Sequence, residues 1–599
     1  MENKKQAIIL SGVAIVALLA LIIGATYAYF RASGNSGSNT DINVTTYTLD
    51  LLSFEMGSDI KINADQTSFA SGKGNATGST FAKAILTANN KTNTATKNYY
   101  MYLNISNNTF TYTQNENTPE LLLTITDVSG NAITSITGLT YKTVIDGKGT
   151  SVSGFDITTK SGLLTLFDNR EITASPTKTE EWNVTVTFVN YNVNQTGNAG
   201  KSFNAKLMIQ QEEYELTLAD ICAGKTLSDC VISQYTGTQG DNALYYHNST
   251  LTNGAGDNSY RYAGGDYVLT EAGKATGATM MIGYNNSVTT ALIDFYCNGT
   301  KQYVGYASSC STSHYYLIKG DTTQYQTYNE ALNASVEKGY LTKDNVKNFV
   351  CFGSDATTCP TENLYRIIGV FNNHVKLIKY DYAKSSLLGT DGDFSQEYTS
   401  NYFSGEQGES PSSNSLYYWN NAGTNTWSAS KLNTVNLNTN FTTNIGTAWA
   451  NKIATTTWKV GGGTYANLRD AVPKTAYQYE VGSSASTTTY DAKIGLMYVS
   501  DYYYSASPSA WTLVGYNSDY TKSYASAKGE NWLYGGGWDW TISRFSDYSY
   551  TALYVTSYGY VNYSIVHNSF NGVRPSFSLL SSTTYVSGSG SMSDPVRIN

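Results

Sequence analysis

The sequence predicts a mainly β protein that begins with one apolar helix and ends in an α+β domain. Short stretches of alternating apolar and polar residues recur along the chain, and Gly, Asn and Asp turns separate them, as in antiparallel sheets. Only 14% of the 599 residues are charged, and the net charge is −8. Because a single core rarely exceeds about 250–300 residues, we expect several domains. No stretch of the sequence is rich in Lys and Arg, which argues against nucleic acid as a partner.

The first 30 residues predict a signal peptide or an N-terminal membrane anchor. Lys4 and Lys5 precede an uncharged run at 6–30, whose centre at 8–23 is almost wholly Ile, Leu, Val and Ala. About 20 apolar residues span a bilayer, so the length fits either role. The two lysines place the N-terminus in the cytoplasm and the rest of the chain outside. We therefore expect an extracellular protein that is secreted, or anchored to the cell membrane by this helix.

Residues 31–211 have the pattern of a β-sandwich. Alternating stretches lie at 46–51, 121–125 and 182–188, and the run at 203–210 has the pattern of a last strand.

The residues that follow the apolar run resemble a known processing region. Residues 24–30, Gly-Ala-Thr-Tyr-Ala-Tyr-Phe, are similar to that of camelysin/TasA-like secreted proteins of Gram-positive bacteria, with Thr26 and Ala28 at the −3 and −1 positions of a cleavage site. The resemblance implies a jelly-roll or pilin-like sandwich in 31–211. Such a domain would act as a stalk or a fibre-forming unit, and an inert spacer is the alternative.

Residues 212–348 predict a Cys/Tyr-rich insert or entry segment to the last domain, not an independent fold. The pattern at 216–221 favours a short helix, and 327–339 favours a helix that ends at Gly339. A loop rich in Gly and Asn lies between them, at 253–260.

The six cysteines fall in three close pairs, which predicts local disulfides in an oxidising environment, although fifteen connectivities are formally open. A metal site is the competing interpretation, but the chain has no Cys-x-x-Cys motif and its four histidines are scattered. We expect no metal and no cofactor. The predicted pairs are Cys222/Cys230, Cys297/Cys310 and Cys351/Cys359.

Residues 531–575 predict a fixed core beside a polar, tyrosine-rich segment. Three tryptophans lie within nine positions, and each needs a partner for its indole N–H when it is buried. Two arginines bracket the polar run, and an Arg guanidinium can join two segments through carbonyls or a carboxylate. The residues expected to hold this scaffold are Trp532, Trp538, Trp540, Arg544 and Arg574.

The motifs of this region resemble a known fold family. Trp-Asp-Trp-Thr at 538–541 and Gly-Val-Arg-Pro at 572–575 are similar to the ending of the formylglycine-generating-enzyme branch of the C-type-lectin-like fold, and to surface domains of gut Gram-positive bacteria. Val-Cys-Phe-Gly at 350–353 and Leu-Tyr-Arg-Ile-Ile-Gly-Val at 364–370 resemble the opening of those domains. The resemblance covers about 349–580 and implies a C-type-lectin-like domain in 349–599.

The same resemblance argues against an enzyme. Formylglycine-generating enzymes use a cysteine pair late in the fold, whereas the last cysteine of this chain is Cys359. Other chemical motifs are incomplete as well: Gly461-Gly462-Gly463 lacks the Lys-Ser/Thr of a phosphate loop, and Asp391-Gly392-Asp393 lacks the downstream Glu of a calcium loop. What the resemblance leaves is a scaffold that displays a ligand-binding face.

Related variable proteins are targets of diversity-generating retroelements, in which adenine-directed mutagenesis rewrites codons near the end of the gene. AAY codons changed in this way cannot encode Lys, Glu, Gln, Met or Trp. Residues 545–571 contain none of these five and include six tyrosines. The alternative is a plain polar hairpin in a protein that is rich in tyrosine throughout.

The segment 545–571 predicts a β-hairpin with strands at 552–555 and 560–563. If Leu553, Val555 and Val561 face inward, then Tyr554, Tyr560 and Asn562 face outward by alternation, although a slip of one residue would reverse every face. Tyrosine offers large contacts at low entropy cost, while Ser and Asn adapt their hydrogen bonds. The predicted ligand-binding residues are Asp547, Tyr548, Tyr550, Tyr554, Tyr558, Tyr560, Asn562, Tyr563, His567 and Asn568.

The sequence therefore favours an extracellular ligand-recognition or adhesion protein that binds a protein or glycan on another cell, phage or host surface. The alternative is a structural fibre or biofilm-matrix subunit of the TasA/camelysin type, which would assemble through the β-sandwich. The membrane would be contacted only through the N-terminal helix.

Overall fold

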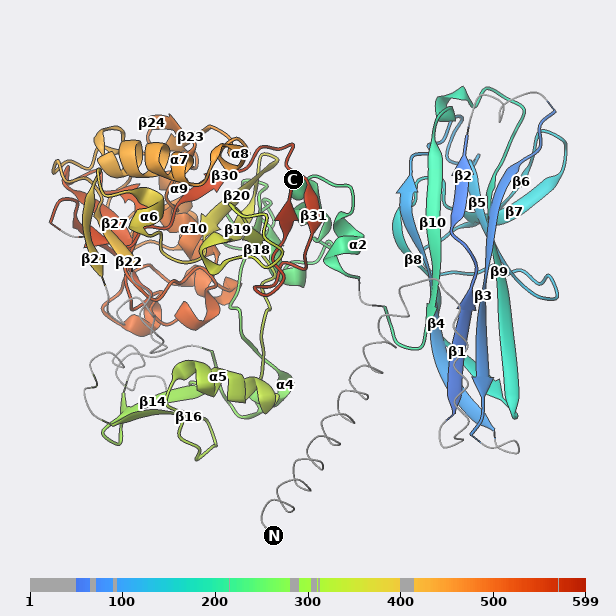
Figure 1. Ribbon diagram of the computed structural model, residues 1–599, viewed down its shortest axis with the longest axis horizontal. Coiled ribbons are helices and arrows are strands. Elements are labelled where there is room, and N and C mark those ends of the chain that lie inside the picture. The colour runs from blue at the N-terminus through green and yellow to red at the C-terminus, as the bar shows by residue number, and fades with distance from the viewer. Residues whose placement is uncertain are drawn as a thin grey trace, which may run out of the picture. The chain divides into compact units, whose positions relative to one another are not determined.

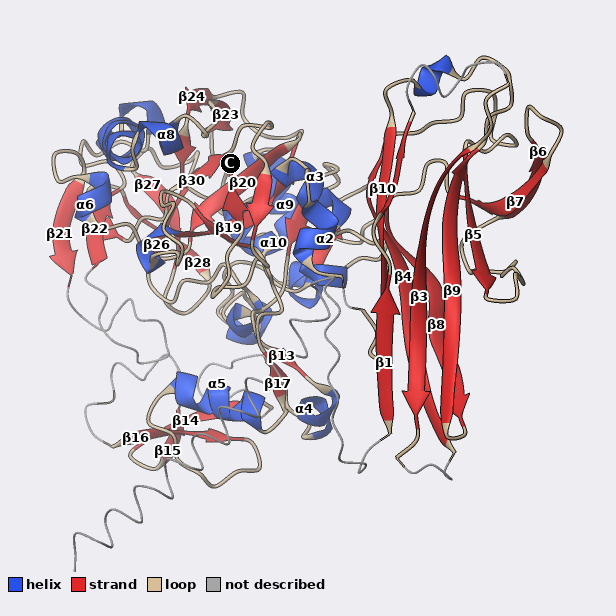
Figure 2. Cartoon of the chain, turned by 45° about the vertical axis from the view of Figure 1, so that its right-hand side comes forward, coloured by secondary structure: helices blue, strands red, loops and turns tan. Residues whose placement is uncertain are grey.

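The computed structural model divides into two compact units, Met1–Leu216 and Thr217–Asn599 (Figure 1). The fold is mainly β, with several antiparallel sheets and fewer helices, as predicted (Figure 2). None of the helices among the described residues is long and apolar enough to cross a membrane. The predicted signal peptide or anchor at 1–30 lies outside the described residues, which are 50–64, 72–89, 94–214, 216–280, 290–302, 310, 313–398, 414–568 and 570–599.

The first unit consists of two antiparallel sheets, with strand orders β1-β3-β9-β5-β7-β6 and β2-β10-β4-β8. Side chains from both sheets meet in one hydrophobic core. The strands are β1 (Leu51–Met56), β2 (Ile60–Asn63), β3 (Ala76–Thr87), β4 (Ala95–Asn108), β5 (Leu121–Asp127), β6 (Tyr141–Ile145), β7 (Ser151–Asp156), β8 (Gly162–Ala174), β9 (Thr177–Phe188) and β10 (Ser202–Gln210).

The alternation of the sequence explains why these strands share a core. Every second residue of β10 is buried, from Phe203 to Ile209, so one face of the strand lies in the core and the other lies outside. The predicted strands at 121–125, 182–188 and 203–210 lie within β5, β9 and β10 and are confirmed. The predicted strand at 46–51 lies mostly outside the described residues.

The second unit has a seven-stranded sheet at its centre, in the order β11-β12-β19-β20-β30-β25 with β18 on β19. Segments far apart in the sequence supply these strands. They are β11 (Leu244–Tyr246), β12 (Tyr260–Tyr262), β18 (Phe349–Cys351), β19 (Leu364–Phe371), β20 (His374–Lys379), β25 (Ile494–Gly495) and β30 (Ser576–Ser578).

The segment 212–348 contributes β11 and β12 to this central sheet, so the compact unit begins at Thr217 and not at 349. β12 pairs with β19 through Tyr260↔Val370 and Arg261↔Gly369. A Cβ at Gly369 would lie 2.2 Å from the Tyr260 carbonyl oxygen, so the two strands approach closely only because glycine stands there.

A smaller cluster lies within the same segment. Strands β14 (Ile293–Cys297), β15 (Thr300–Gln302) and β16 (His314–Ile318) form a sheet that α5 (Tyr328–Glu337) packs against. The predicted helix at 327–339 is confirmed as α5, with Thr327 as its N-cap and Gly339 at a positive φ just past its end. From here on, we call this smaller cluster of β14, β15, β16 and α5 the insert, and not the whole of 212–348.

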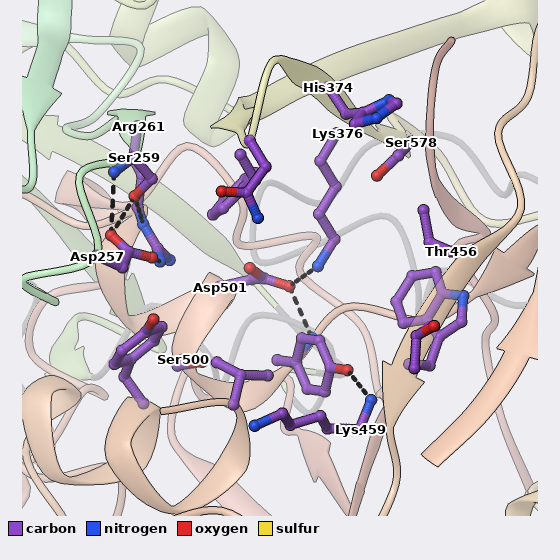
Figure 3. A pocket seen from close by; sticks show the side chains of 17 residues that line it. Asp257, Ser259, Arg261, His374, Lys376, Thr456, Lys459, Ser500, Asp501 and Ser578 are labelled. Atoms are coloured by element: carbon purple, nitrogen blue, oxygen red, sulfur yellow. Dashed lines mark hydrogen bonds and ion pairs between the residues drawn. The ribbon is translucent and has the colours of Figure 1, made fainter. Parts of the chain in front are cut away.

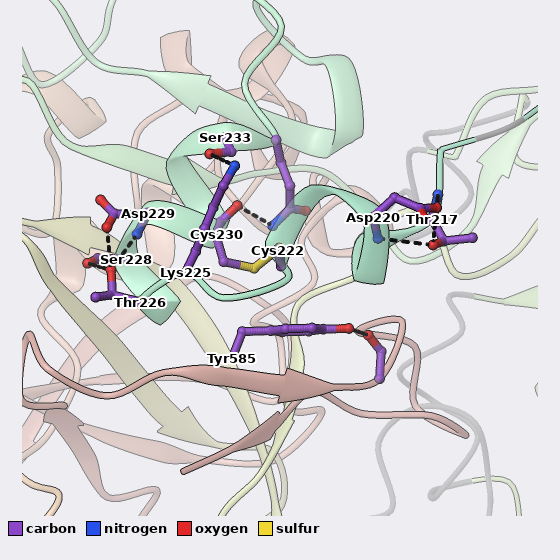
Figure 4. Close-up of a disulfide and its surroundings, with 12 residues drawn as sticks. Thr217, Asp220, Cys222, Lys225, Thr226, Ser228, Asp229, Cys230, Ser233 and Tyr585 are labelled. Atoms are coloured by element: carbon purple, nitrogen blue, oxygen red, sulfur yellow. Dashed lines mark hydrogen bonds between the residues drawn. A yellow bond between two sulfur atoms is a disulfide. The ribbon is translucent and has the colours of Figure 1, made fainter. Parts of the chain in front are cut away.

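All three predicted disulfides are present, with S–S distances of 2.04–2.06 Å. The Cys222–Cys230 bond joins α2 (Leu218–Cys222) to α3 (Leu227–Ser233) (Figure 4). Beside it, the Tyr585 amide donates to the Lys225 carbonyl at 3.2 Å, which ties the chain's last segment to this loop. Three closed pairs fit an oxidising, extracellular environment.

The other two disulfides also close short loops. The Cys351–Cys359 bond links the end of β18 to the turn before β19. The Cys297–Cys310 bond lies in the insert and joins the end of β14 to Cys310, a residue outside any helix or strand. Cys310 is half-buried against the hydrophobic cluster of the insert, unlike Cys222 and Cys230, which are fully buried. The residues on either side of Cys310, at 303–309 and 311–312, lie outside the described part of the chain.

The second unit has further helices and strands outside the central sheet and the insert. The helices are α4 (Glu271–Ala275), α6 (Ser385–Leu388), a π-helix (Leu432–Phe441), α7 (Thr442–Asn444), α8 (Thr447–Ala450), α9 (Pro473–Glu480) and α10 (Val499–Tyr504). The strands are β13 (Val268–Leu269), β17 (Leu341–Thr342), β21 (Phe394–Tyr398), β22 (Asn414–Tyr418), β23 (Thr456–Lys459), β24 (Thr489–Ala492), β26 (Asp539–Arg544), β27 (Thr551–Val555), β28 (Val561–Ile565), β29 (Phe570–Asn571), β31 (Tyr585–Ser587) and β32 (Arg597–Ile598).

Candidate ligand-binding surface

The predicted hairpin is present as β27 and β28, which pair antiparallel beside β26. Val555 pairs with Val561, and Tyr554 pairs with Asn562. The Thr556 amide donates to the Tyr560 carbonyl at 2.9 Å and closes the turn, which Gly559 makes possible at a φ of +84°.

Leu553, Val555 and Val561 are buried, as predicted. Tyr554 lies between the buried Leu553 and Val555 in the strand and is half-buried, because its ring packs against Trp538 and Trp540 at centroid distances of 6.2 and 5.8 Å. Burial there raises the pKa of Tyr554 to about 12. The second face of the hairpin, with Tyr554 and Asn562, is therefore only partly exposed.

The exposed tyrosine of β28 is Tyr563, which pairs with buried Leu553 and so stands on the same face. Its ring is partly exposed, and the ring centroid lies 5.0 Å from that of Tyr465. Tyr465 also packs on Phe545, at 4.1 Å, and contacts Tyr548, at 5.9 Å.

These contacts continue into one connected group of rings, which we call the tyrosine surface. Three of its tyrosines, at 548, 550 and 563, are 42%, 44% and 36% exposed. Ring-to-ring or cation-to-ring contacts link every member to the next. The members are Tyr465, Arg469, Tyr516, Tyr520, Tyr548, Tyr550, Tyr558, Tyr560 and Tyr563.

Arg469 joins the two halves of the tyrosine surface. Its guanidinium carbon lies 4.6 Å from the ring centroid of Tyr465, 4.7 Å from that of Tyr516 and 5.7 Å from that of Tyr563. Its Nε donates to Asp470 at 2.7 Å. A guanidinium held between ring faces fixes the rings by cation–π attraction and leaves them little freedom to lose on binding.

A buried hydrogen-bond network supports the loop that carries Tyr548 and Tyr550. The Asn425 side-chain amide donates to the carbonyls of Phe545, Tyr548 and Thr551 at 2.9, 2.7 and 2.8 Å. The Arg544 Nη1 donates to Asn425 Oδ1 at 3.1 Å, and its Nε donates to the Val460 carbonyl at 3.0 Å. Arg544 therefore joins separate segments through carbonyl and amide groups, as its position in the sequence predicts.

The three tryptophans each donate their indole N–H to a partner. The acceptor is the Tyr262 carbonyl for Trp532, Ser557 Oγ for Trp538 and the Tyr417 carbonyl for Trp540, at 2.9, 3.2 and 2.8 Å. The acceptors lie in three different segments, near 262, 417 and 557, so these hydrogen bonds attach residues 532–540 to the rest of the unit.

Arg574 forms a buried ion pair with Asp539. Its Nε donates to Asp539 Oδ2 at 2.5 Å, and its Nη2 donates to the Leu533 carbonyl at 2.7 Å. Burial raises the pKa of Asp539 to about 6, and the charge of Arg574 limits the rise.

The other predicted contact residues lie in different surroundings. Asp547 and Asn568 are exposed, while Asn562 and His567 are half-buried, and His567 packs beside Gly423. Tyr558 packs against the hydrophobic cluster of the insert, so only part of its ring is available to a ligand.

Sequence reasoning did not find Tyr465, Arg469, Tyr516, Tyr520 or Asn425. They lie upstream of 545–571, and none of them belongs to a recognisable local motif. Only the tertiary contacts bring them beside the hairpin.

No three His, Cys, Asp or Glu side chains come together as a metal site in the described part of the chain. The incomplete calcium-loop motif has a structural role instead, because the Asp393 carboxylate accepts the amides of Asn421 and Leu432 at 3.1 and 2.8 Å. No protein-family model matches the chain, and no curated protein is significantly similar to it.

Proposed function

We propose that this protein is an extracellular recognition or adhesion protein that binds a macromolecular ligand through the tyrosine surface. The observation that carries the proposal is the connected group of partly exposed tyrosines around Arg469. Large tyrosine rings with few charges between them are typical of surfaces that bind proteins, because each ring offers a wide contact at low entropy cost.

The arrangement of the second unit supports a C-type-lectin-like scaffold of the formylglycine-generating-enzyme branch. The two ends of the resembling region meet in the central sheet, where β20 pairs with β30. The Trp-Asp-Trp-Thr and Gly-Val-Arg-Pro motifs meet through the Asp539–Arg574 pair. For the first unit, the two-sheet sandwich supports a jelly-roll or pilin-like stalk.

The separation of exposed from buried residues within 545–571 supports diversification by a retroelement. Tyr548, Tyr550 and Asn568 project from loops into solvent, where replacement has little effect on the fold. Leu553 and Val555 are fully buried and belong to the core. Variation confined to the first group would change the ligand and preserve the scaffold.

Sequencing the 3′ end of the gene across many cells of one strain tests the retroelement. We expect substitutions at codons 547, 548, 550, 563 and 568, none at 553 and 555, and an invariant near-copy beside a reverse transcriptase gene. A uniform sequence with no near-copy and no reverse transcriptase gene nearby would rule out the retroelement, and the tyrosine surface would then be a binding surface of fixed sequence.

Binding of the fluorescently labelled full chain to panels of bacterial and epithelial cells tests recognition itself. We expect Tyr548→Ser/Tyr550→Ser to lower cell binding about tenfold or more. Tyr479→Ser is the matched control, since Tyr479 is 37% exposed on α9 and is not a member of the tyrosine surface. Equal binding by both variants, together with ordered polymers of the purified protein, would instead support the fibre subunit.

A further inference from the structure

A second candidate site lies in a cavity of about 470 Å³ in the C-terminal unit, lined by residues of β12, β20, β23, α9 and α10 (Figure 3). Its volume is in the range of small-molecule sites, which combine apolar walls with a few convergent polar groups. None of its lining residues belongs to the tyrosine surface.

The floor of this cavity is a lysine–aspartate pair. Lys376 Nζ donates to Asp501 Oδ2 at 2.6 Å, and the Tyr498 amide donates to the same oxygen at 2.8 Å. The two side chains are only 9% and 3% exposed. Both hydrogen bonds end on Oδ2, Asp501 lines the cavity, and its second carboxylate oxygen lies on the side away from Lys376 (Figure 3).

A second ion pair forms one wall. Arg261 Nη2 donates to Asp257 Oδ2 at 2.6 Å, and Arg261 Nε donates to Ser259 Oγ at 2.8 Å. Burial by itself would lower the pKa of the Arg261 guanidinium, but the carboxylates of Asp257 and Asp501 outweigh it and raise that pKa. The Asp501 carboxylate is therefore flanked by cations on two sides.

Aromatic faces complete the walls. Lys376 Nζ lies 4.7 Å from the ring centroid of Tyr498 and 5.2 Å from that of Trp458, and the Arg261 guanidinium lies 5.3 Å from that of Tyr477. These rings keep water away from one side of the charged groups, which strengthens their attraction for a ligand of opposite charge.

The charges of the cavity do not cancel. Lys376, Arg261 and Lys459 carry three positive charges, against two negative charges on Asp257 and Asp501, so the cavity has a net charge of +1 with His neutral. Lysine has three donors, and only one is used in the bond to Asp501. Donors and positive charge are thus in excess, while one acceptor, Asp501 Oδ1, stands beside them.

We propose that this cavity binds a small polar carboxylate whose neighbouring carbon carries a hydroxyl or an ammonium group. The ligand carboxylate pairs with Lys376, the neighbouring hydroxyl or ammonium donates to Asp501 Oδ1, and the rest of the ligand lies against Trp458 and Tyr477. A free α-amino acid and an α-hydroxy acid, such as the aldonate form of a sugar, both offer this chemistry. The proposal does not depend on the tyrosine surface.

Titration of the full chain with individual compounds tests the proposal, with tryptophan fluorescence and calorimetry as readouts. The probes are glycine, alanine, glutamate, gluconate, galactonate, lactate, acetate and the neutral hexoses glucose and galactose. We expect saturable binding of an amino acid or of a hydroxy acid, weaker binding of acetate and none of the neutral hexoses. A response to amino acids alone identifies one source, and a response to the hydroxy acids alone identifies the other.

The double variant Lys376→Met/Asp501→Asn removes both charges, and the Asn side-chain oxygen can still accept from the Tyr498 amide that caps α10. We expect it to weaken binding about tenfold or more. The matched control is Lys274→Met/Glu271→Gln, an exposed pair of the same 2.6 Å separation, which should bind as the original chain does. Binding of neutral hexoses as strong as that of the hydroxy acids, no response to any carboxylate, or undiminished binding by the folded double variant would each overturn the proposal.

Discussion

Arg544 donates a hydrogen bond to the side chain of Asn425, a residue 119 positions earlier in the chain, and Asn425 in turn holds the loop with the two most exposed tyrosines of the surface. The loop of Tyr548 and Tyr550 therefore has a fixed support in the core. A surface of this kind combines replaceable side chains with a backbone that does not have to be ordered on binding.

Replacing Asn425 by Ala should destabilise the protein and loosen this loop. The change removes the shorter hydrogen bond to each of the Phe545 and Thr551 carbonyls and leaves them only the longer bonds from Arg544 Nη1 and the Phe545 amide, at 3.5 and 3.3 Å, which should cost about 1–3 kcal/mol. Urea unfolding would measure the loss, and hydrogen exchange should rise across 545–551. Asn421→Ala is the control from the same loop, because exposed Asn421 uses its backbone amide and not its side chain in the bond to Asp393. Equal stability of the two variants would contradict the assigned role.

Tyr465 and Tyr550 should respond differently to truncation, although both belong to the tyrosine surface. Tyr465 packs on Phe545 and on the Arg469 guanidinium, so Tyr465→Ser should cost about 1–3 kcal/mol in the free energy of unfolding. Tyr550 is 44% exposed, the most exposed of these tyrosines, and Tyr550→Ser should change stability by less than about 0.5 kcal/mol. Denaturant titrations of the two variants give the comparison. A larger loss for Tyr550→Ser would mean that the exposed loop is part of the core.

Local sequence pattern predicts those elements whose partners lie nearby. The alternation in β10, the hairpin of β27 and β28, and the three short cysteine loops are all of this kind. The pairing of β12 with β19 could not be predicted, because three residues of strand find their partner more than 100 positions later and the decisive feature is the missing side chain of Gly369. The partial burial of Tyr554 could not be predicted either, because alternation assigns faces but does not show that Trp540 of the neighbouring strand packs beside its ring.

The same limit applies to the candidate site. Composition identifies the tyrosines of 545–571, since they are close together in the sequence. Arg469 and Tyr465 are recognised only when the fold brings them beside Tyr563. Nothing near Lys376 in the sequence indicates that Asp501 will be its partner, 125 positions away.

The buried pair of Asp539 and Arg574 should be more sensitive to the loss of one partner than to the loss of both. Arg574→Met leaves the Asp539 carboxylate buried without its cation and should cost about 3–5 kcal/mol. Arg574→Met/Asp539→Leu should cost less, because no unpaired charge remains. Guanidinium unfolding curves would separate the two. As a control, Lys522→Met removes an exposed cation beside Asp519 and should cost no more than about 1 kcal/mol. A double variant less stable than Arg574→Met would refute this explanation.

The Asp257–Arg261 pair predicts a specific loss of stability in acid. Burial by itself would raise the pKa of Asp257, but Arg261 and the Ser259 hydrogen bonds outweigh it and lower the pKa from 3.8 to about 2. Because the pKa in the folded state is below its unfolded value, the carboxylate stabilises the fold above about pH 4, and this contribution is lost as the pH falls toward 2. The difference corresponds to about 2 kcal/mol.

Asp257→Asn should therefore lower stability at neutral pH and flatten the decline between pH 4 and 2. Urea unfolding at several pH values measures both effects, and Asp547→Asn serves as the control because that carboxylate is exposed and accepts from Ser546 beside it. Arg261 keeps its bond to Ser259 and its contact with Tyr477 in the variant, so the change isolates the carboxylate. If the free energy of unfolding of Asp257→Asn declines between pH 4 and 2 as steeply as that of the original chain, the carboxylate does not stabilise this wall of the cavity above pH 4.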